Sequence, residues 1–371
     1  MRNYEGLILE SSAPKKIATR RAFRAGVATI GLLSGLAFTA SAQAEDFFKG
    51  KTVELLIGYP AGSGYDIYAR LVADNIVRFL PGKPNIIPRN MPGAGSWRVV
   101  KYIYEVAKKD GTVWGSVDRG AATEPLLYGT DSKAPFKNPL DLTWIGSLTN
   151  EIGVAAVWHT TGIKNWEETI HKPVIVSMAS AQGGLSARAI NAILGTQFKQ
   201  VCCYGGDTNQ NLAMERGEVE GRIGWSWSSL KATHMDWVKE GKINLLMQVG
   251  LEKNPEIPGD IPLVLDLTKD EKDKAALKII FSNQSIGRPF IMPGGVAPER
   301  IAEVRHAFTQ MVTDPAFLAK AEKERLEIDG PKSGEEIEAL LKEVYASPAD
   351  AIAAARTAIK EGEIKMLDSK K

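Results

Sequence analysis

The chain has 371 residues, of which 44% are hydrophobic and 24% are charged, and its formal net charge is +2. These values are typical of a globular protein of about two domains and exclude a disordered or low-complexity chain. Residues 1–44 contain six basic and two acidic side chains, so the rest of the chain has 40 basic and 42 acidic side chains. That near balance excludes a strongly basic nucleic-acid-binding surface, and no nucleic-acid partner is predicted.

Residues 1–44 are predicted to form an export signal. Basic side chains precede a mildly apolar stretch over residues 25–40, and the sequence AQA at 42–44 has the AxA pattern of a cleavage site. The sequence TRRAF at 19–23 resembles a twin-arginine signal, while a Sec signal remains the alternative. We therefore expect cleavage after Ala44 and a periplasmic location.

The first predicted elements after this signal are a strand over Thr52–Ile57, a glycine-rich turn and a helix with apolar residues at helical spacing over 68–80. The turn, GYPAGSGYD at 58–66, lacks the lysine of a P-loop and the third glycine of a dinucleotide-binding motif. Ser63 and Asp66 have the spacing of a capping box, which favours a structural role for Asp66. The first N–H groups of a helix lack internal partners and favour an anion, so the turn is predicted to bind one. A tight turn without a ligand remains the alternative.

The following residues predict a short strand at 86–87, a helix after the loop 90–96, and a strand over Thr112–Val117. This βαβαβ order predicts a parallel, doubly wound sheet. In such sheets ligands bind outside the carboxyl ends of the strands. The loops expected at that edge are residues 59–65, 90–96 and 118–123.

The alternation begins again in the second half, with a strand over Val174–Ser177, a small-residue loop and a helix over Leu185–Leu194. Further predicted elements are strands at 198–204, 223–225 and 245–249 and a short helix at 211–216. From about Phe281 the composition changes, and a loop-rich crossing at 288–295 precedes helices only. The predicted helix starts are Pro298, Pro315, Ser333 (as a cap with Glu336) and Pro348.

The C-terminal helices are expected to pack on the first half of the chain. Domain 1 would then comprise residues 45–149 and 283–371, and domain 2 would be an insertion over residues 150–282.

The two cysteines, Cys202 and Cys203, are adjacent in the sequence. Neighbouring side chains on a strand point to opposite faces, so a bridge between them would be strained. Both are predicted to be small strand residues, with a redox role as the alternative.

Catalytic and metal-binding motifs are not found. The four histidines stand far apart, there is no CxxC motif, and the sequence GWSWS at 224–228 ends in serine where GxSxG requires glycine. We therefore predict a protein that is not an enzyme and has no cofactor or metal. A catalytic group assembled only by the fold remains the alternative.

For Trp227 a core position is favoured, whereas for Trp225 a core position and stacking on a ligand both remain open.

Together these motifs resemble a known family. YPAGSGYD at 59–66, NMPGAG at 90–95 and DGT at 110–112 are similar to the solute receptors of the tripartite tricarboxylate transporters, the Bug family. YGG at 204–206, GEV at 217–219 and the stretch Pro293–Arg300 are further matches, so the resemblance covers nearly the whole chain after residue 44. Departures from the family pattern are Ala61 and Ser63 in place of glycines, Gly205 in place of a frequent lysine, and a longer stretch at 265–280.

The resemblance implies an α/β fold of the type II periplasmic binding proteins, with two domains that are each a doubly wound sheet flanked by helices and are joined by a hinge. It implies a monomeric receptor that captures a small carboxylate and delivers it to transporter subunits in the membrane. A binding protein that serves a sensor kinase is the alternative, and an exported enzyme on the same scaffold is a third hypothesis. The resemblance and the loop positions together give this expected ligand-binding set: Tyr59, Pro60, Ala61, Gly62, Ser63, Gly64, Tyr65, Asp66, Arg119, Ala121, Ala122, Ser177, Ala179, Ser180, Gln182, Gly183, Ser186 and Trp225.

Overall fold

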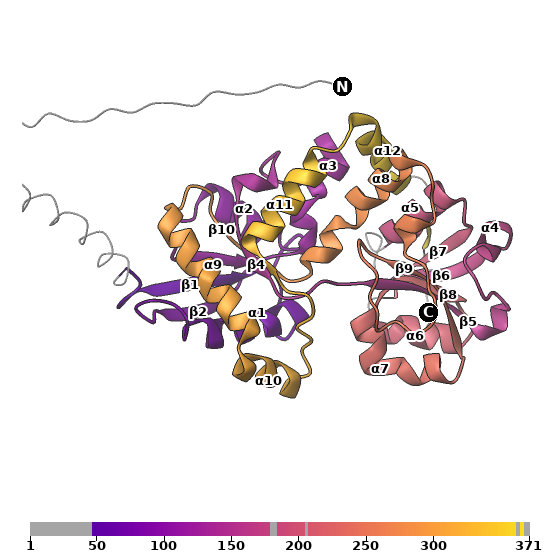
Figure 1. Ribbon diagram of the computed structural model, residues 1–371, viewed down its shortest axis with the longest axis horizontal. Helices are drawn as coiled ribbons and strands as arrows, with labels where there is room; N and C mark the ends of the chain where they lie inside the picture. Colours follow the sequence, from indigo (N-terminus) through magenta and orange to yellow (C-terminus); the bar gives the residue numbers. More distant parts are fainter. Residues whose placement is uncertain (1–46, 179–183, 205–206, 361–363, 367–371) are drawn as a thin grey trace, which may run out of the picture. The chain divides into compact units, whose positions relative to one another are not determined.

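Two six-stranded sheets organise the chain (Figure 1). The computed structural model describes residues 47–178, 184–204, 207–360 and 364–366. Both sheets lie within the compact unit formed by residues 45–371, and the predicted export signal lies outside the described residues. Helices flank both sheets, which confirms the α/β class expected from the alternation of strand and helix patterns.

The first sheet has the strand order β11-β4-β10-β3-β1-β2. Its strands are β1 (Thr52–Ile57), β2 (Asn85–Asn90), β3 (Val113–Ser116), β4 (Thr143–Ser147), β10 (Pro289–Met292) and β11 (Lys332–Ser333). As predicted, β1 is parallel to β2 and to β3. The sheet is mixed, because β10 is antiparallel to both β3 and β4.

The expectation that residues after Phe281 form only loops and helices is wrong for β10, for β11 and for β12 (Ile364–Met366). Residues 289–292 are buried at all four positions. A short strand that is buried on both faces has no apolar–polar alternation, so it leaves no local pattern to detect.

Helices cover both faces of the first sheet. They are α1 (Gly64–Ile76), α2 (Trp97–Glu105), α9 (Pro298–Thr313), α10 (Pro315–Lys323) and α11 (Gly334–Tyr345). Helix α3 (Glu124–Tyr128) instead places Leu126 and Leu127 in the core of the second sheet. One core joins α1 and α9 to the sheet, and another joins α2 and α11 to it. The predicted cap of α11 is confirmed, because Ser333 and Glu336 form both hydrogen bonds of a capping box.

The second sheet has the order β12-β7-β6-β8-β5-β9. Its strands are β5 (Gly153–Trp158), β6 (Val174–Met178), β7 (Phe198–Cys202), β8 (Gly221–Ser226), β9 (Ile243–Val249) and β12 (Ile364–Met366). Its helices are α4 (Glu168–His171), α5 (Leu185–Leu194), α6 (Asp207–Glu215), α7 (Trp227–Lys239) and α8 (Glu271–Phe281). Strand β6 is parallel to β7 and β8, so the carboxyl ends of β6 and β7 lie at the same edge.

The last helix, α12 (Ala349–Lys360), packs against α5 and α8 of the second sheet. The expected packing of the C-terminal helices on the first half therefore holds for α9 to α11. Helix α12 packs mainly on the second sheet and also contacts α3 of the first half, where Nε of Arg356 donates to the carbonyl of Leu126 at 2.8 Å. The predicted domain boundaries stay a proposal.

Two crossing segments between the sheets are residues 148–152, between β4 and β5, and residues 282–288, between α8 and β10. Residues 346–348, between α11 and α12, are a further connection. The two crossing segments lie side by side, because the N–H of Glu151 donates to the carbonyl of Gln284 at 2.9 Å and that of Gly287 donates to the carbonyl of Thr149 at 2.9 Å. A change in the arrangement of the sheets would therefore bend these two segments together.

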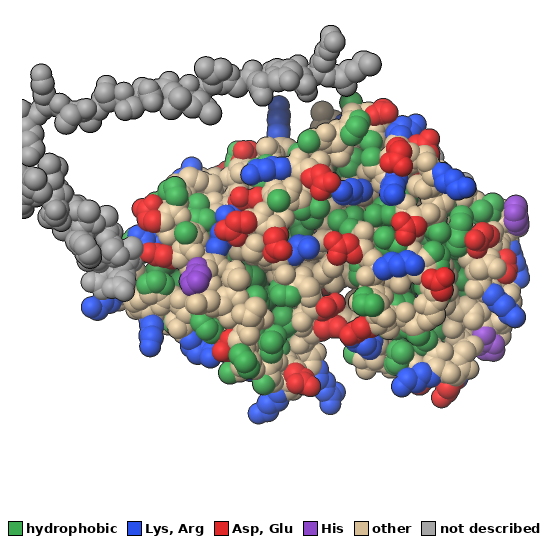
Figure 2. Space-filling view, viewed as in Figure 1, with side chains coloured by type: hydrophobic (Ala, Val, Ile, Leu, Met, Phe, Trp, Pro, Cys, Tyr) green, Lys and Arg blue, Asp and Glu red, His purple; other side chains and the backbone are tan. Residues whose placement is uncertain are grey.

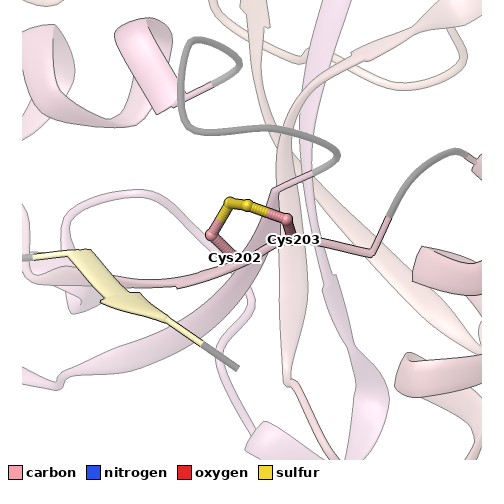
Figure 3. The surroundings of a disulfide bond; sticks show 2 residues. All are labelled: Cys202 and Cys203. Carbon is pink, nitrogen blue, oxygen red and sulfur yellow. A yellow bond between two sulfur atoms is a disulfide. The ribbon is translucent and has the colours of Figure 1, made fainter. Parts of the chain in front are cut away.

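Cys202 and Cys203 form a disulfide bond (Figure 3). The expectation of two unbridged strand residues is therefore wrong. It assumed that both cysteines lie on a strand, but β7 ends at Cys202, and the peptide bond between the two residues is cis. The alternation of side chains between the faces of a sheet does not extend to Cys203.

The face drawn in Figure 2 has lysine and arginine side chains interspersed with aspartate and glutamate. This agrees with the near balance of charge after residue 44. Within the described ranges, none of the helices has the length and apolar character needed to cross a membrane.

Candidate functional site

The turn between β1 and α1 is held by Asp66. Its carboxylate accepts hydrogen bonds from the N–H of Gly62 at 2.8 Å, from Nδ2 of Asn90 at 2.7 Å and from Nε of Arg70 at 2.9 Å. Ser63 caps α1, with its Oγ accepting from the N–H of Asp66. Burial alone would raise the pKa of Asp66, but the hydrogen bonds from Arg70, Gly62 and Asn90 outweigh it and hold that pKa below its usual value. Asp66 is thus an ionised structural group that is only 3% exposed.

The same turn leaves two N–H groups available. Those of Gly64 and Tyr65, in the first turn of α1, make no hydrogen bond within the described part of the chain. A Cβ atom added at Gly62 or Gly64 would meet nothing within 4 Å, and Gly62 has a φ of +80°. Pro60, Ala61, Gly62 and Gly64 are exposed. An acid group can therefore approach these amides without displacing a side chain.

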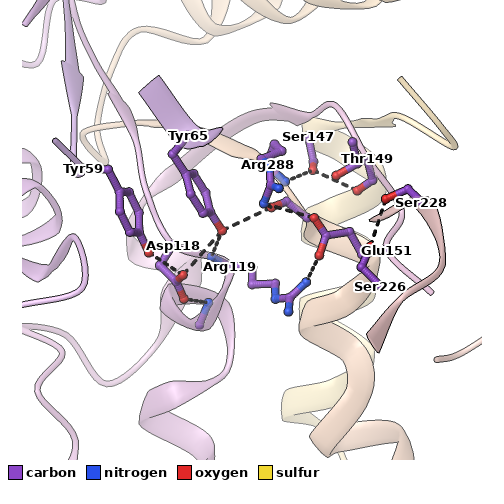
Figure 4. Close-up of polar contacts among 12 residues, drawn as sticks. Tyr59, Tyr65, Asp118, Arg119, Ser147, Thr149, Glu151, Ser226, Ser228 and Arg288 are labelled. Atoms are coloured by element: carbon purple, nitrogen blue, oxygen red, sulfur yellow. Dashed lines mark hydrogen bonds and ion pairs between the residues drawn. The ribbon is translucent and has the colours of Figure 1, made fainter. Parts of the chain in front are cut away.

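Tyr59 and Tyr65 flank this turn as a stacked pair, with ring centroids 4.3 Å apart and an interplanar angle of 9°. Both hydroxyls donate hydrogen bonds to Oδ2 of Asp118, that of Tyr59 at 2.7 Å and that of Tyr65 at 3.4 Å (Figure 4). Burial and the neighbouring charge of Asp118 raise the pKa of Tyr59 far above its usual value, so its hydroxyl stays protonated. Asp118 itself caps the short 3₁₀ turn Arg119–Ala122 through the N–H of Gly120.

A glutamate with two arginines lies next to the tyrosines (Figure 4). Glu151 forms ion pairs with Arg119 and with Arg288, the latter at 3.0 Å between Oε1 and Nη1. The charge of Glu151 raises the pKa of Arg119. The guanidinium of Arg288 also lies over the ring of Tyr65, with its Cζ 4.6 Å from the centroid. The two ion pairs of Glu151 thus connect the loop after β3 to both crossing segments.

A small cavity of about 30 Å³ adjoins this cluster. Its lining includes Thr149, Glu151 and Arg288 together with Trp227 and Ser228 at the start of α7. Thr149 Oγ1, Arg288 Nε and Trp227 Nε1 are buried without a partner in the part of the chain that the structure describes. The volume suits about one or two water molecules and is too small for an organic acid.

At the second sheet, Ser177 and Ser186 occupy the expected edge. Ser177, near the end of β6, donates from Oγ to Oε1 of Gln210 at 3.1 Å. Ser186 lies in α5 close to Gly224, where an added Cβ would come within 3.1 Å of its Oγ. Ala179, Ser180, Gln182 and Gly183 lie outside the described residues.

Five of the expected ligand contacts are buried. Ala121 and Trp225 are each 1% exposed, Asp66 is 3% exposed, Ser177 is 5% exposed, and Ala122 is fully buried. Trp225 packs in the core of the second sheet, with the guanidinium of Arg222 4.3 Å from its ring centroid. Trp227, 2% exposed, belongs to the same core, as its sequence context favoured.

The structure thus brings together Tyr59, Tyr65 and Arg119 from the expected set. It adds Asp118, which lies in the expected loop 118–123 but was not in that set, and it adds Glu151 and Arg288, which sequence patterns did not identify. One sequence feature could have identified Asp118, because an aspartate directly before a turn of small residues is a typical cap. No sequence feature identifies Glu151 or Arg288, because these side chains meet only when the two crossing segments, which are far apart in the sequence, pair with each other.

Comparison with known proteins gives one curated relative. No protein-family model matches the chain. A protein of Cupriavidus necator, named UPF0065 protein in gbd 5'region, is 26% identical over 321 residues, covering 81% of this chain and 88% of that protein.

Solved structures of solute-binding proteins share the fold. A TctC solute-binding protein from Polaromonas has a TM-score of 0.64 at 20% identity, covering 84% of this chain and 98% of that one. MatC from Rhodopseudomonas palustris, solved with bound malate, has a TM-score of 0.52 at 16% identity, covering 83% and 99%. The periplasmic binding protein BugD has a TM-score of 0.51 at 17% identity, covering 84% and 96%. These similarities confirm the resemblance expected from the sequence motifs and the two-domain periplasmic binding protein fold.

Proposed function

We propose that this protein is a periplasmic solute-binding protein that captures a small carboxylate between its two sheets and delivers it to a tripartite tricarboxylate-type transporter in the membrane. The observation that carries the proposal is the pair of N–H groups at Gly64 and Tyr65, which have no hydrogen-bond partner among the described residues. They lie at the carboxyl end of β1, where ligands of open α/β sheets bind, and at the positive end of the α1 dipole. MatC, with the same fold, holds malate.

The groups around the turn leave the acid-binding role to the amides. Both tyrosine hydroxyls donate to Asp118 and both arginines are paired with Glu151, so these side chains add no net charge, and support for a carboxylate rests on the N–H groups and the α1 dipole. An uncharged donor set backed by partial positive charge holds an acid group without a dedicated lysine. On this proposal the ligand contacts come from the turn 59–65 and Arg119 on the first sheet and from Ser177 and Ser186 on the second.

Closure of the two sheets over the ligand would use residues 148–152 and 282–288 as the hinge. Domain 1 would comprise residues 45–149 and 283–371, and domain 2 residues 150–282. The ligand would favour the closed arrangement by the difference between its affinities for the two states.

A thermal-shift panel of organic acids tests carboxylate binding. A ligand at 100 times its dissociation constant stabilises the folded state by about 2.7 kcal/mol, a shift of about 5 °C for a chain of this size. The bound compound should be recovered unchanged by mass spectrometry, whereas turnover would favour an exported enzyme. A panel of mono-, di- and tricarboxylates without any shift would refute the proposal.

Two further experiments test location and delivery. Protein isolated from the periplasm should begin at Glu45, and a cytoplasmic full-length chain would contradict export. Deletion of the gene should abolish uptake of the identified acid. Normal uptake with loss of gene induction would instead favour a binding protein that serves a sensor kinase.

A further inference from the structure

Asp207 and Arg222 form an ion pair at the ligand edge of the second sheet. Arg222 lies in β8 in register with Ser177 near the end of β6, and Asp207 is the first residue of α6. The Arg222 side chain is only 5% exposed, whereas that of Asp207 is 49% exposed. A charge as buried as Arg222 requires a counter-charge, which explains why Asp207 is ionised and fixed in place.

The orientation of Asp207 is set from several sides. Its Oδ1 pairs with Nη2 of Arg222, and its Oδ2 accepts from Oγ of Ser229 at 2.8 Å. The guanidinium of Arg222 is itself fixed by Oδ1 of Asn211 at 2.6 Å and by the ring of Trp225. An ionised carboxylate has about four acceptor positions, and these contacts use two. The exposed half of Asp207 can therefore accept further hydrogen bonds.

Asp207 is linked to the first turn of α7, which also lines the small cavity. Its partner Ser229 follows Ser228, which lines the small cavity together with Glu151 and Arg288. The two sides of the site thus differ in chemistry. The β1–α1 turn offers hydrogen-bond donors to an acid group, and Asp207 offers acceptors while repelling a second acid group.

We propose that Asp207 is a specificity-determining residue, which selects carboxylates that also carry a hydroxyl or ammonium group. This inference rests on the proposed function, because it assigns the acid group of the ligand to the β1–α1 turn. The donor group of the ligand would bind the exposed oxygens of Asp207, and Arg222 would keep Asp207 in position without contacting the ligand.

Matched ligand series test the inference by isothermal titration calorimetry. Each series has one carbon skeleton with hydrogen, hydroxyl or ammonium at the same carbon: propionate, lactate and alanine; succinate, malate and aspartate; glutarate, 2-hydroxyglutarate and glutamate. In at least one series, the hydroxy or amino acid should bind the wild-type protein at least about tenfold more tightly than the unsubstituted acid, as expected for one hydrogen bond to a charged group.

Asp207→Asn should reduce that preference to less than about threefold, because it replaces an acceptor oxygen with a donor. Asp236→Asn, which removes an exposed carboxylate from α7 beside the same sheet, should keep it. The double variant Asp207→Ser/Arg222→Met leaves no unpaired buried charge and provides a folded protein if Asp207→Asn is unstable. It should also lose the preference.

The outcomes separate this inference from the proposed function. Acids that bind without any preference for a hydroxyl or ammonium group overturn the role of Asp207 and leave carboxylate binding intact. A preference that survives in Asp207→Asn or in the double variant does the same. If no acid of any series and none of the wider panel binds, the proposed function itself fails.

Discussion

Glu151 and Arg288 join the two crossing segments by an ion pair of 3.0 Å. The other oxygen of Glu151 is paired with Arg119 in the loop after β3, so one carboxylate holds two guanidinium groups. The side chains of Arg119, Arg288 and Glu151 are 34%, 23% and 15% exposed, and solvent screens their charges only in part. Glu151 therefore connects the candidate ligand edge to the segments through which the sheets are joined.

Replacement of Glu151 by glutamine should destabilise the protein. The variant leaves two partly buried like charges without their counter-charge, and we expect a loss of about 2 kcal/mol in the free energy of unfolding. Urea denaturation at pH 7 measures it. Glu343→Gln is the matched control, because Glu343 and its partner Lys278 are 62% and 41% exposed and such pairs contribute less than about 1 kcal/mol. Equal losses in the two variants would show that Glu151 has no special role.

Asp66→Asn should destabilise the β1–α1 turn in a pH-dependent manner. The pKa of Asp66 is lower in the folded protein than its unfolded value of about 3.9, so its carboxylate stabilises the fold above that value. This stabilisation is lost as the pH falls through the folded pKa. We expect the variant to be less stable by about 2 kcal/mol at pH 7. The difference should shrink below about pH 4.

Urea unfolding of the wild-type protein and Asp66→Asn at pH 7, 5 and 3 provides the measurement. Asp74→Asn in the same helix is the control, since Asp74 is 64% exposed and pairs with Lys320 on the surface. A constant difference between the wild-type protein and Asp66→Asn over the whole pH range would contradict the ionised state assigned to Asp66.

Local sequence patterns predicted much of this architecture because they act within a few residues. The turn 58–66 and the cap Ser63 follow from such patterns, and the structure has them as expected. Strand β10 differs, because it is stabilised by pairing Phe290 with Ser116, far away in the sequence. Its residues are buried on both faces and show no alternation.

The charged residues of the candidate site likewise depend on contacts between residues that are far apart in the sequence. Arg119 was expected because the family resemblance and the loop 118–123 after a predicted strand together point to it. Glu151 and Arg288 come together only when the two crossing segments align, and Asp207 meets Arg222 only when α6 packs beside β8. Each side chain alone is an ordinary charged residue of a surface loop or a strand, so no periodicity or motif distinguishes it.

Gly64→Val should weaken ligand binding with little effect on stability. The added side chain meets no atom within 4 Å of its Cβ position, so it causes no clash, but it covers the free N–H groups of α1. We expect at least a tenfold loss of affinity for the identified acid, about 1.4 kcal/mol, measured by calorimetry. Unchanged affinity would refute this placement of the acid group.

Gly62→Val should lose both binding and stability. At a φ of +80° a valine costs about 2 kcal/mol in backbone strain. Gly217→Val is the matched control, because Gly217 has a φ of +71°, has no atom within 4 Å of an added Cβ, and follows the C-terminal end of α6, opposite to Asp207. It should lose similar stability and keep its affinity. A loss of affinity in the control would assign the effect of Gly62→Val to global destabilisation.

The disulfide between Cys202 and Cys203 should be present in protein isolated from an oxidising compartment. Trypsin is expected to release both cysteines in one peptide, QVCCYGGDTNQNLAMER, and without reduction this peptide should lack two hydrogen atoms and take up no iodoacetamide. After reduction it should take up two equivalents of iodoacetamide.

Because adjacent residues enclose almost no loop, reduction should change the free energy of unfolding by only about 1 kcal/mol. In Cys203→Ser, Cys202 should react once in the unfolded protein without reduction. Alkylation of both cysteines in unreduced wild-type protein would show that the bond does not form.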